Sequence, residues 1–379
     1  MKIALIRQRY NAYGGAERFI ERAAAALRAE GSLSLSLIAR DWQGGHGEAE
    51  LVKCDPPYVG RTWRDWSFAR SACEAIARGQ YDLVQSHERI ACCDIFRAGD
   101  GVHAQWLDNR ERVLGSAARW AQAASPWHRY TLAAERRLFS SPRLKAVICN
   151  SRMVAEEVRR HFGLVPEKLH VIYNGVDLSQ FHPGLQQEAR ASIRARLGVP
   201  AEAMMFLFVG SGFERKGVPQ LLEAFARMAA APEGKVCLVI VGQDRKAAAM
   251  QARAQALGLA DRVFFPGPQR DIAAWYAAAD CFVLPTLYDP FPNAVLEAMA
   301  SGLPVITSAQ CGAAELLEAD RTGWVCDALD CAALAGHLSA LDPAKARRMG
   351  AEARKLAERF PLEATARQLT DLYRRLLVP

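Results

Sequence analysis

The chain has 379 residues, a length that favours two domains over one. Of these residues 51% are hydrophobic and 23% charged, a composition that excludes a disordered chain. Its net charge is +7, and the whole excess lies in residues 1–170, which hold 26 Lys and Arg against 19 Asp and Glu. This asymmetry indicates an anionic partner for the first half, such as a membrane surface, a phosphorylated substrate or nucleic acid.

Short β-like runs alternate with amphipathic stretches through the first half. Strands are expected at 2–7, 33–39, 81–86 and 145–150. Helices are expected around 16–29, 64–78, 126–140 and 151–161. Such alternation predicts a parallel sheet with right-handed crossovers. We expect the opening MKIALIR to be a first strand and not a signal peptide, and no run reaches the roughly 18 apolar residues that span a bilayer.

The alternation begins again after a turn-rich segment at 173–186. Strands are expected at 204–210, 235–242, 262–267, 280–286 and 303–308, and late helices at 328–341, 343–358 and 362–376. We therefore predict two doubly wound α/β domains, namely residues 1–172, onto which the C-terminal helix 360–379 packs back, and residues 173–359. Ligands in such sheets lie outside the carboxyl ends of the strands, so two facing domains predict a cleft between them.

The ten cysteines are scattered through apolar runs and include no C-x-x-C pair. Such cysteines behave as small core residues, so we expect reduced thiols in a cytoplasmic protein. The histidines show no metal-site spacing, so we predict no metal site.

The segment PTLYDPFPNAVLEAMASGLPVITS (285–308) carries the strongest chemical pattern. It passes from a strand through a turn into a helix whose first N–H groups, near Phe291, Pro292 and Asn293, favour an anion such as a diphosphate. The carboxylates of Asp289 and Glu297 suit the vicinal hydroxyls of a ribose or hexose. A helix N-terminal carboxylate and a solvated glutamate would explain the same spacing.

This segment resembles the signature of retaining glycosyltransferases of family 4, which have the two-domain GT-B fold. That family carries two glutamates seven residues apart, followed by A-M-A-x-G-x-P-V. Here Asp289 replaces the first glutamate and Pro292 replaces a glycine, whereas Glu297 and AMASGLPV match. The resemblance implies a nucleotide-sugar donor, with Glu297 on the ribose and Asp289 on the donor hexose.

A second pattern, VGSGFERKGV (209–218), directly follows a predicted strand. Arg215 and Lys216 at a helix start would neutralise a diphosphate and stabilise its charge as the sugar leaves. A solvated basic turn is the ordinary alternative. Family members commonly place an arginine where this chain has Ser211, so the resemblance assigns that role to Arg215.

Two further segments lie in the first half. The segment YNAYGGAERF (10–19) lacks the G-x-G-x-x-G spacing of a dinucleotide-binding loop. The family resemblance places its glycines, Gly14 and Gly15, next to the donor. A tight turn, which would also need glycine, is the alternative. In RAGDGVHAQW (97–106) the resemblance makes Asp100 and His103 candidates for contacts to the donor hexose and the acceptor hydroxyl. A structural histidine is the alternative.

Within the family, GSGFERKGV and VGQDRK are similar to members that glucosylate the heptose of the lipopolysaccharide inner core. The resemblance implies UDP-glucose as donor, an anionic glycolipid acceptor, no metal, and retention of the anomeric configuration without a dedicated general base. Tryptophans interleaved with arginines at 103–132 and 62–70 favour peripheral contact with the cytoplasmic face of the inner membrane, although core tryptophans are the alternative.

Three alternatives remain open. Another family 4 transferase would use a different donor or acceptor. A GT-B nucleotide-sugar 2-epimerase would convert its substrate without an acceptor. The third is a non-enzymatic nucleotide-sugar or nucleic-acid binding protein, which only the basic half suggests. A nucleic-acid partner is not expected, because we find no basic stripe or known module.

Overall fold

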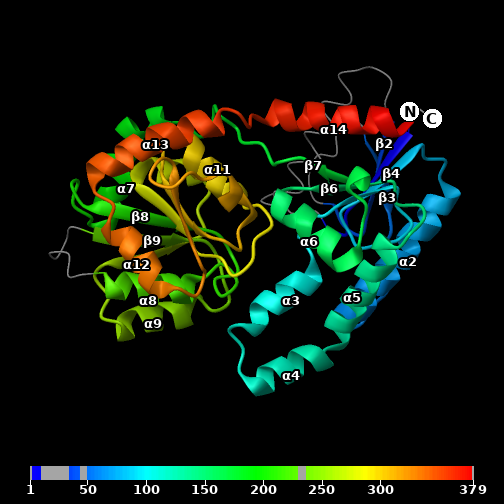
Figure 1. Cartoon of the computed structure of the whole chain (residues 1–379), viewed down its shortest axis with the longest axis horizontal. Helices are drawn as coiled ribbons and strands as arrows, with labels where there is room; N and C mark the ends of the chain where they lie inside the picture. Colours follow the sequence, from blue (N-terminus) through cyan, green and yellow to red (C-terminus); the bar gives the residue numbers. More distant parts are fainter. Residues whose placement is uncertain (1, 10–33, 43–48, 229–235, 378–379) are drawn as a thin grey trace. The chain divides into compact units, whose positions relative to one another are not determined.

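A computed structural model describes residues 2–9, 34–42, 49–228 and 236–377 (Figure 1). They belong to two compact units: unit 1 comprises residues 1–174 and 362–379, and unit 2 comprises residues 175–361. The boundaries expected from the sequence, after residues 172 and 359, lie close to these.

Unit 1 is built on a seven-stranded, all-parallel sheet in the order β3-β2-β1-β4-β5-β6-β7. Its strands are β1 (Lys2–Ile6), β2 (Ser34–Ala39), β3 (Glu50–Lys53), β4 (Leu83–Ser86), β5 (Ile95–Arg97), β6 (Ala146–Cys149) and β7 (Leu169–Val171). Its described helices are α2 (Gly60–Arg78), α3 (His103–Glu111), α4 (Ser116–Ala124), α5 (Pro126–Phe139), α6 (Arg152–Phe162), the 3-10 turn η1 (Pro166–Lys168) and α14 (Leu362–Leu377). The strand order reverses between β1 and β4, where doubly wound sheets bind ligands.

Alternate residues of β1 enter two hydrophobic cores, one on each face of this sheet. Ile3 and Leu5 join the core that α14 completes, whereas Ala4 and Ile6 join the core made with α2, α5 and α6. Tyr373 of α14 is fully buried, and its hydroxyl donates to a glutamine side chain of β4 at 2.6 Å. The last helix of the chain is thus an integral layer of unit 1.

The cysteines require a correction. Cys73 of α2 and Cys92 after β4 form a disulfide with Cα atoms 5.8 Å apart, so the expectation that all ten thiols are reduced was wrong for this pair. Their separation of 19 residues gave no signal of pairing. Seven of the other eight are buried, as expected of core cysteines, and Cys331 is half-buried.

Unit 2 contains a six-stranded parallel sheet in the order β10-β9-β8-β11-β12-β13. Its strands are β8 (Met204–Val209), β9 (Val236–Val241), β10 (Val263–Gly267), β11 (Cys281–Leu284), β12 (Val305–Ser308) and β13 (Gly323–Cys326). Its described helices are η2 (Pro183–Leu185), α7 (Gln186–Leu197), α8 (Val218–Arg227), α9 (Ala247–Ala256), α10 (Ile272–Ala278), α11 (Asn293–Ala300), η3 (Gly312–Leu316), α12 (Cys331–Ser339) and α13 (Pro343–Ala357). Here the order reverses between β8 and β11.

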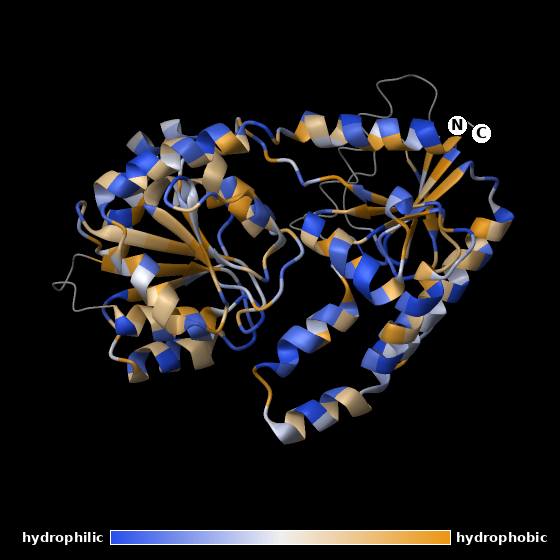
Figure 2. Cartoon of the chain, in the orientation of Figure 1, coloured by the Kyte–Doolittle hydropathy of each residue, from blue (hydrophilic) through white to orange (hydrophobic). Residues whose placement is uncertain are grey.

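The central strands of unit 2 are continuous apolar runs, because helices cover both faces of the sheet. Figure 2 shows hydrophobic strands at the centre of each unit and helices of mixed character around them. The prediction of two doubly wound α/β domains is confirmed. None of the helices in the described residues combines the length and apolar character needed to cross a membrane.

Candidate functional site

The two motifs of unit 2 follow neighbouring strands, β8 and β11, at the reversal point of the sheet. Their loops are bonded to each other. Leu287 N–H donates to the Arg215 carbonyl at 2.8 Å, and the Thr286 hydroxyl donates to the same oxygen at 3.0 Å. At Gly217 φ is +78°, and a Cβ atom would lie 1.8 Å from the Pro285 carbonyl oxygen, so this approach requires glycine.

This contact brings three of the predicted site residues together. Asp289 Oδ2 lies 3.1 Å from Lys216 Nζ and 3.5 Å from Arg215 Nη1. Arg215 also donates to the Tyr288 carbonyl at 2.7 Å. The side chains of Lys216 and Asp289 are only 12% and 10% exposed, so solvent screens their charges weakly. Two cations against one carboxylate leave this corner with one net positive charge.

The backbone of Asp289 is fixed from the next loop of the sheet. Its N–H donates to the Gln310 carbonyl at 3.0 Å, and its carbonyl accepts from Gly312 N–H at 2.8 Å. The loops after β8, β11 and β12 therefore form one hydrogen-bonded edge. A side chain held in this way has little freedom to move from the position that its chemistry requires.

Helix α11 begins four residues after Asp289. Pro292 occupies its N-cap and provides no side-chain hydrogen bond. Phe291 is 3% exposed, and Asn293, the first helical residue, is half-buried. The positive end of the helix dipole therefore lies in the same loop as Asp289, which contacts the cationic pair of the neighbouring loop, and this suits an anionic group.

Glu297 lies on α11 and is 8% exposed. Its Oε2 accepts a hydrogen bond of 3.1 Å from the hydroxyl of Tyr276, a fully buried residue of α10. Tyr276 in turn packs edge-on against Phe181, with ring centroids 5.8 Å apart. No sequence pattern singled out Tyr276, which orients the predicted carboxylate.

Two of the predicted residues of unit 1 lie where β5 leads into α3: Asp100 precedes the helix and His103 is its first residue. Asp100 is exposed, with its carboxylate 3.7 Å from Arg7. His103 is 6% exposed, its Nε2 lies 3.0 Å from Nδ1 of His128, and its backbone N–H donates to Glu135 at 2.6 Å. Burial, reinforced by the charge of Arg89, lowers the pKa of His103 to about 3. The imidazole is therefore neutral at physiological pH.

Acid should destabilise the chain through His103. Its pKa is about 3 when folded and about 6.5 when unfolded, so below pH 6.5 the unfolded chain binds a proton that the folded chain does not. Stability that is fully present above pH 6.5 is then lost as the pH falls towards 3. We expect the urea midpoint of unfolding to drop between about pH 7.5 and pH 5. The midpoint of His103→Gln should drop by less over the same range. Equal drops would mean that His103 is protonated in the folded chain.

Gly14 and Gly15 lie outside the described residues, so their predicted role next to the donor stays a prediction. Within the described ranges, no group of three or more His, Cys, Asp or Glu side chains is arranged to hold a metal ion. The structure brings together Arg215, Lys216 and Asp289, whereas Glu297 pairs with Tyr276.

Comparison with known proteins identifies the family. Residues 13–180 match the profile described as Glycosyltransferase Family 4, and residues 189–356 match Glycosyl transferases group 1. A D-inositol 3-phosphate glycosyltransferase of Streptomyces avermitilis is 31% identical, over 94% of this chain and 78% of its own. The chain belongs to glycosyltransferase family 4. The lipopolysaccharide glucosyltransferase WaaG of Escherichia coli is 25% identical, over 86% of this chain and 85% of its own.

Solved structures show the same fold. A crystal structure of WaaG superposes with a TM-score of 0.84 at 23% identity, covering 98% of this chain and 99% of that one. The Anabaena protein HepE, solved with UDP-glucose, gives 0.70 at 21% identity, with 99% and 100% covered. This family 4 chain is therefore a glycosyltransferase of the GT-B type, as its signature segment predicted.

Proposed function

We propose that this transferase moves glucose from UDP-glucose onto a lipopolysaccharide inner-core heptose or a similar glycolipid, with retention and without a metal ion. The observation that carries the proposal is the cluster of Arg215, Lys216 and Asp289 between β8 and β11. Two relatives support the choice of substrates: WaaG is named as a lipopolysaccharide glucosyltransferase, and HepE was solved with UDP-glucose.

The donor binds unit 2 in this proposal. Arg215, Lys216 and the first N–H groups of α11 hold the diphosphate, and Asp289 contacts the hexose. Glu297, oriented by Tyr276, accepts hydrogen bonds from the ribose hydroxyls. As the bond to the anomeric carbon breaks, charge grows on the leaving diphosphate, where the two cations stabilise it as a metal ion would.

The acceptor hydroxyl attacks from the face that the nucleotide leaves, and the departing phosphate takes its proton. No protein base is needed for this step. A neutral His103, with its Nε2 next to His128, fits a contact to a hydroxyl group better than a proton transfer. Asp100 is the second candidate for such a contact.

We propose the anionic membrane surface as the partner of unit 1. Trp120 of α4 is 75% exposed, and Trp63 and Trp66 of α2 are 48% and 46% exposed. Figure 1 shows α4 between α3 and the start of α5, away from the sheet of this unit. Exposed tryptophans among arginines suit the headgroup region of an anionic bilayer.

A different acceptor is the second candidate function. The 31% identical relative is named for D-inositol 3-phosphate, a small phosphorylated cyclitol and not a glycolipid. Supplying each acceptor with the responding donor separates the two. An epimerase would instead convert a nucleotide sugar with no acceptor present.

The first experiment is a panel of UDP-, GDP- and ADP-sugars in EDTA, scored for thermal stabilisation and slow donor hydrolysis. UDP-glucose is expected to respond, and Glu297→Ala should weaken its binding about ten- to a hundredfold, because charged hydrogen bonds to the ribose are lost. Glu202→Ala, an exposed carboxylate of the same unit, is the matched control. If Glu297→Ala binds the donor like the control, the ribose assignment is wrong; a response that requires added metal removes metal independence.

A further inference from the structure

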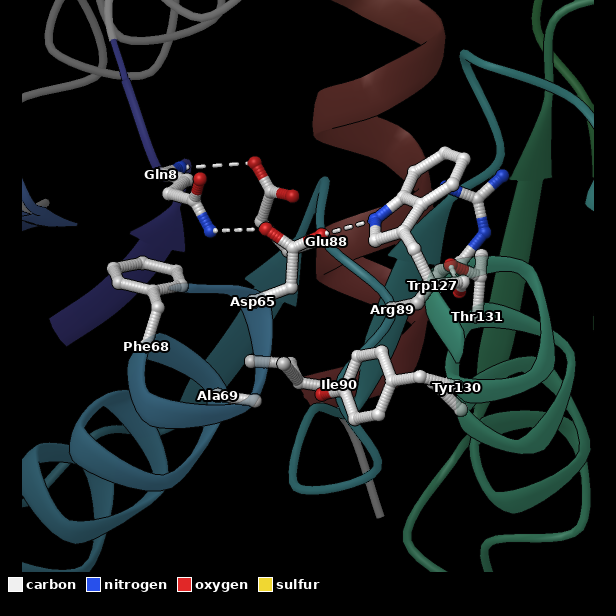
Figure 3. A pocket seen from close by; sticks show the side chains of 11 residues that line it. Gln8, Asp65, Phe68, Ala69, Glu88, Arg89, Ile90, Trp127, Tyr130 and Thr131 are labelled. Atoms are coloured by element: carbon white, nitrogen blue, oxygen red, sulfur yellow. Dashed lines mark hydrogen bonds between the residues drawn. The ribbon is translucent and has the colours of Figure 1, made fainter. Parts of the chain in front are cut away.

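A hollow in unit 1 lies beyond the carboxyl ends of β1 and β4 (Figure 3). Gln8 follows β1, and Glu88 and Arg89 follow β4. The strand order reverses between these two strands, and open α/β sheets bind ligands at this point. The position alone makes the hollow a ligand-site candidate of this unit.

The polar side of the hollow is a fixed hydrogen-bond network. Asp65 of α2 accepts from Gln8 Nε2 at 3.2 Å, from Arg64 Nε at 2.8 Å and from the Trp127 indole at 2.8 Å. The backbone N–H of Gln8 donates to Glu88 Oε1 at 2.9 Å. Side chains from α2, α5 and two strand ends are thereby held in place before any ligand arrives.

Two groups remain for a ligand. Glu88 Oε2 accepts no hydrogen bond within the described part of the chain, and the Tyr130 hydroxyl makes none there either. Burial, with the charge of Asp65, raises the pKa of Tyr130 to about 12, so its hydroxyl keeps a proton to donate. The hollow therefore offers an acceptor on one side and a donor on the other, and a ligand hydroxyl, which both donates and accepts, can use either.

The volume of the hollow and its apolar wall narrow the kind of ligand that it can bind. The volume is about 60 Å³, room for roughly four water molecules, which fits one edge of a sugar ring. Figure 3 shows Phe68, Ala69, Ile90 and Tyr130 on the side opposite the hydrogen-bonded polar groups. An apolar wall facing a polar one suits a sugar, which has C–H faces and hydroxyl edges.

The carboxylate of Glu88 disfavours an anionic group at its end of the hollow. Arg64 pairs with Asp65 at 2.8 Å, and Arg7 lies 3.6 Å from Glu88. Arg89 is paired with Glu135, a buried carboxylate, at 2.9 Å. These three guanidiniums each contact a carboxylate, whereas Arg61, which lies over the Trp127 ring at 3.9 Å, forms no ion pair within the described residues. A phosphate placed against the remaining oxygen of Glu88 would be repelled by that carboxylate.

We propose that this hollow binds a hydroxyl-bearing edge of an uncharged sugar in the acceptor, with Glu88 as the residue that discriminates against phosphorylated sugars. The inference rests on the proposed transfer function, in which unit 1 receives the acceptor. It also separates this chain from relatives named for an inositol phosphate.

The test uses the full chain without a nucleotide sugar and ligand-detected NMR titrations. The neutral probes are methyl α-mannoside and myo-inositol, and the anionic probes are mannose 6-phosphate and D-inositol 3-phosphate. We expect the neutral probes to bind at least about tenfold more tightly. Glu88→Gln should weaken them about tenfold, since a charge-assisted hydrogen bond is lost, and Tyr130→Phe should weaken them severalfold. Glu167→Gln, an exposed carboxylate of unit 1, is the matched control.

Three outcomes would overturn the proposal: tighter binding of the phosphorylated probes, neutral probes that do not bind at 50 mM, or variants that bind like Glu167→Gln. The melting temperature of each variant shows whether it is folded. If the chain binds neutral sugars through Glu88 but binds and hydrolyses no nucleotide sugar, the proposed transfer function is wrong and the sugar site is retained. If the chain transfers sugar to a neutral acceptor at a rate that Glu88→Gln does not change, the transfer function is retained and the proposed role of Glu88 is wrong.

Discussion

Lys216→Ala is expected to lower kcat for sugar transfer by about 30- to 1000-fold, or about 2–4 kcal/mol of transition-state stabilisation. The Lys216 ammonium is 12% exposed and lies 3.1 Å from Asp289. In such a poorly solvated place, a fixed positive charge stabilises the leaving diphosphate far more than water could. The donor KM should rise less than kcat falls, because the charge of the diphosphate grows during the reaction.

Two further variants sharpen this test. Lys355→Ala removes a lysine of the same unit that is 70% exposed on α13, and its kcat should stay at the wild-type value. Lys216→Arg keeps the charge and should recover part of the rate. An unchanged kcat and KM in Lys216→Ala would remove this lysine from the donor site.

The core strands of both sheets could be predicted because burial on two faces leaves continuous apolar runs, as in β8 and β9. The edge strands β3, β7 and β13 were not among the expected strands, although the edge strand β10 was. β3 has three exposed residues among its four, and it forms only because β2 pairs with it. Helix α7 escaped prediction for a similar reason, since its sequence, QQEARASIRARL, is dominated by polar and charged residues.

The donor cluster was predictable because its residues follow directly on strands that the apolar runs identify. Sheet topology then places the ends of β8 and β11 next to each other. The contact between Tyr276 and Glu297 could not be predicted, because Tyr276 lies in an apolar helix where a role in the core explains a tyrosine equally well. The network of Gln8, Asp65 and Trp127 also depends on tertiary packing between elements that no local pattern connects.

Arg194→Leu should lower the free energy of unfolding by about 3–5 kcal/mol, because buried oxygen atoms would lose their hydrogen-bond donor. Arg194 of α7 is 2% exposed, and its guanidinium donates to five oxygens. These are Asp280 Oδ2 at 2.7 Å and the carbonyls of Ala278, Pro200, Ala201 and Ala203 at 3.2, 3.1, 3.0 and 2.6 Å. Urea unfolding measures the loss.

Arg190→Leu is the matched control for this variant. Arg190 lies one helical turn earlier, binds the other oxygen of Asp280 at 2.7 Å and donates to the carbonyls of Ala278 and Ala279 at 3.3 Å each, but its side chain is 32% exposed. Its loss should cost about 1 kcal/mol. Equal losses would show that the carbonyls do not depend on Arg194. The segments that Arg194 ties together lead into β8 and β11, the strands whose far ends carry Lys216 and Asp289, so this one side chain fixes the amino ends of both strands that form the donor site.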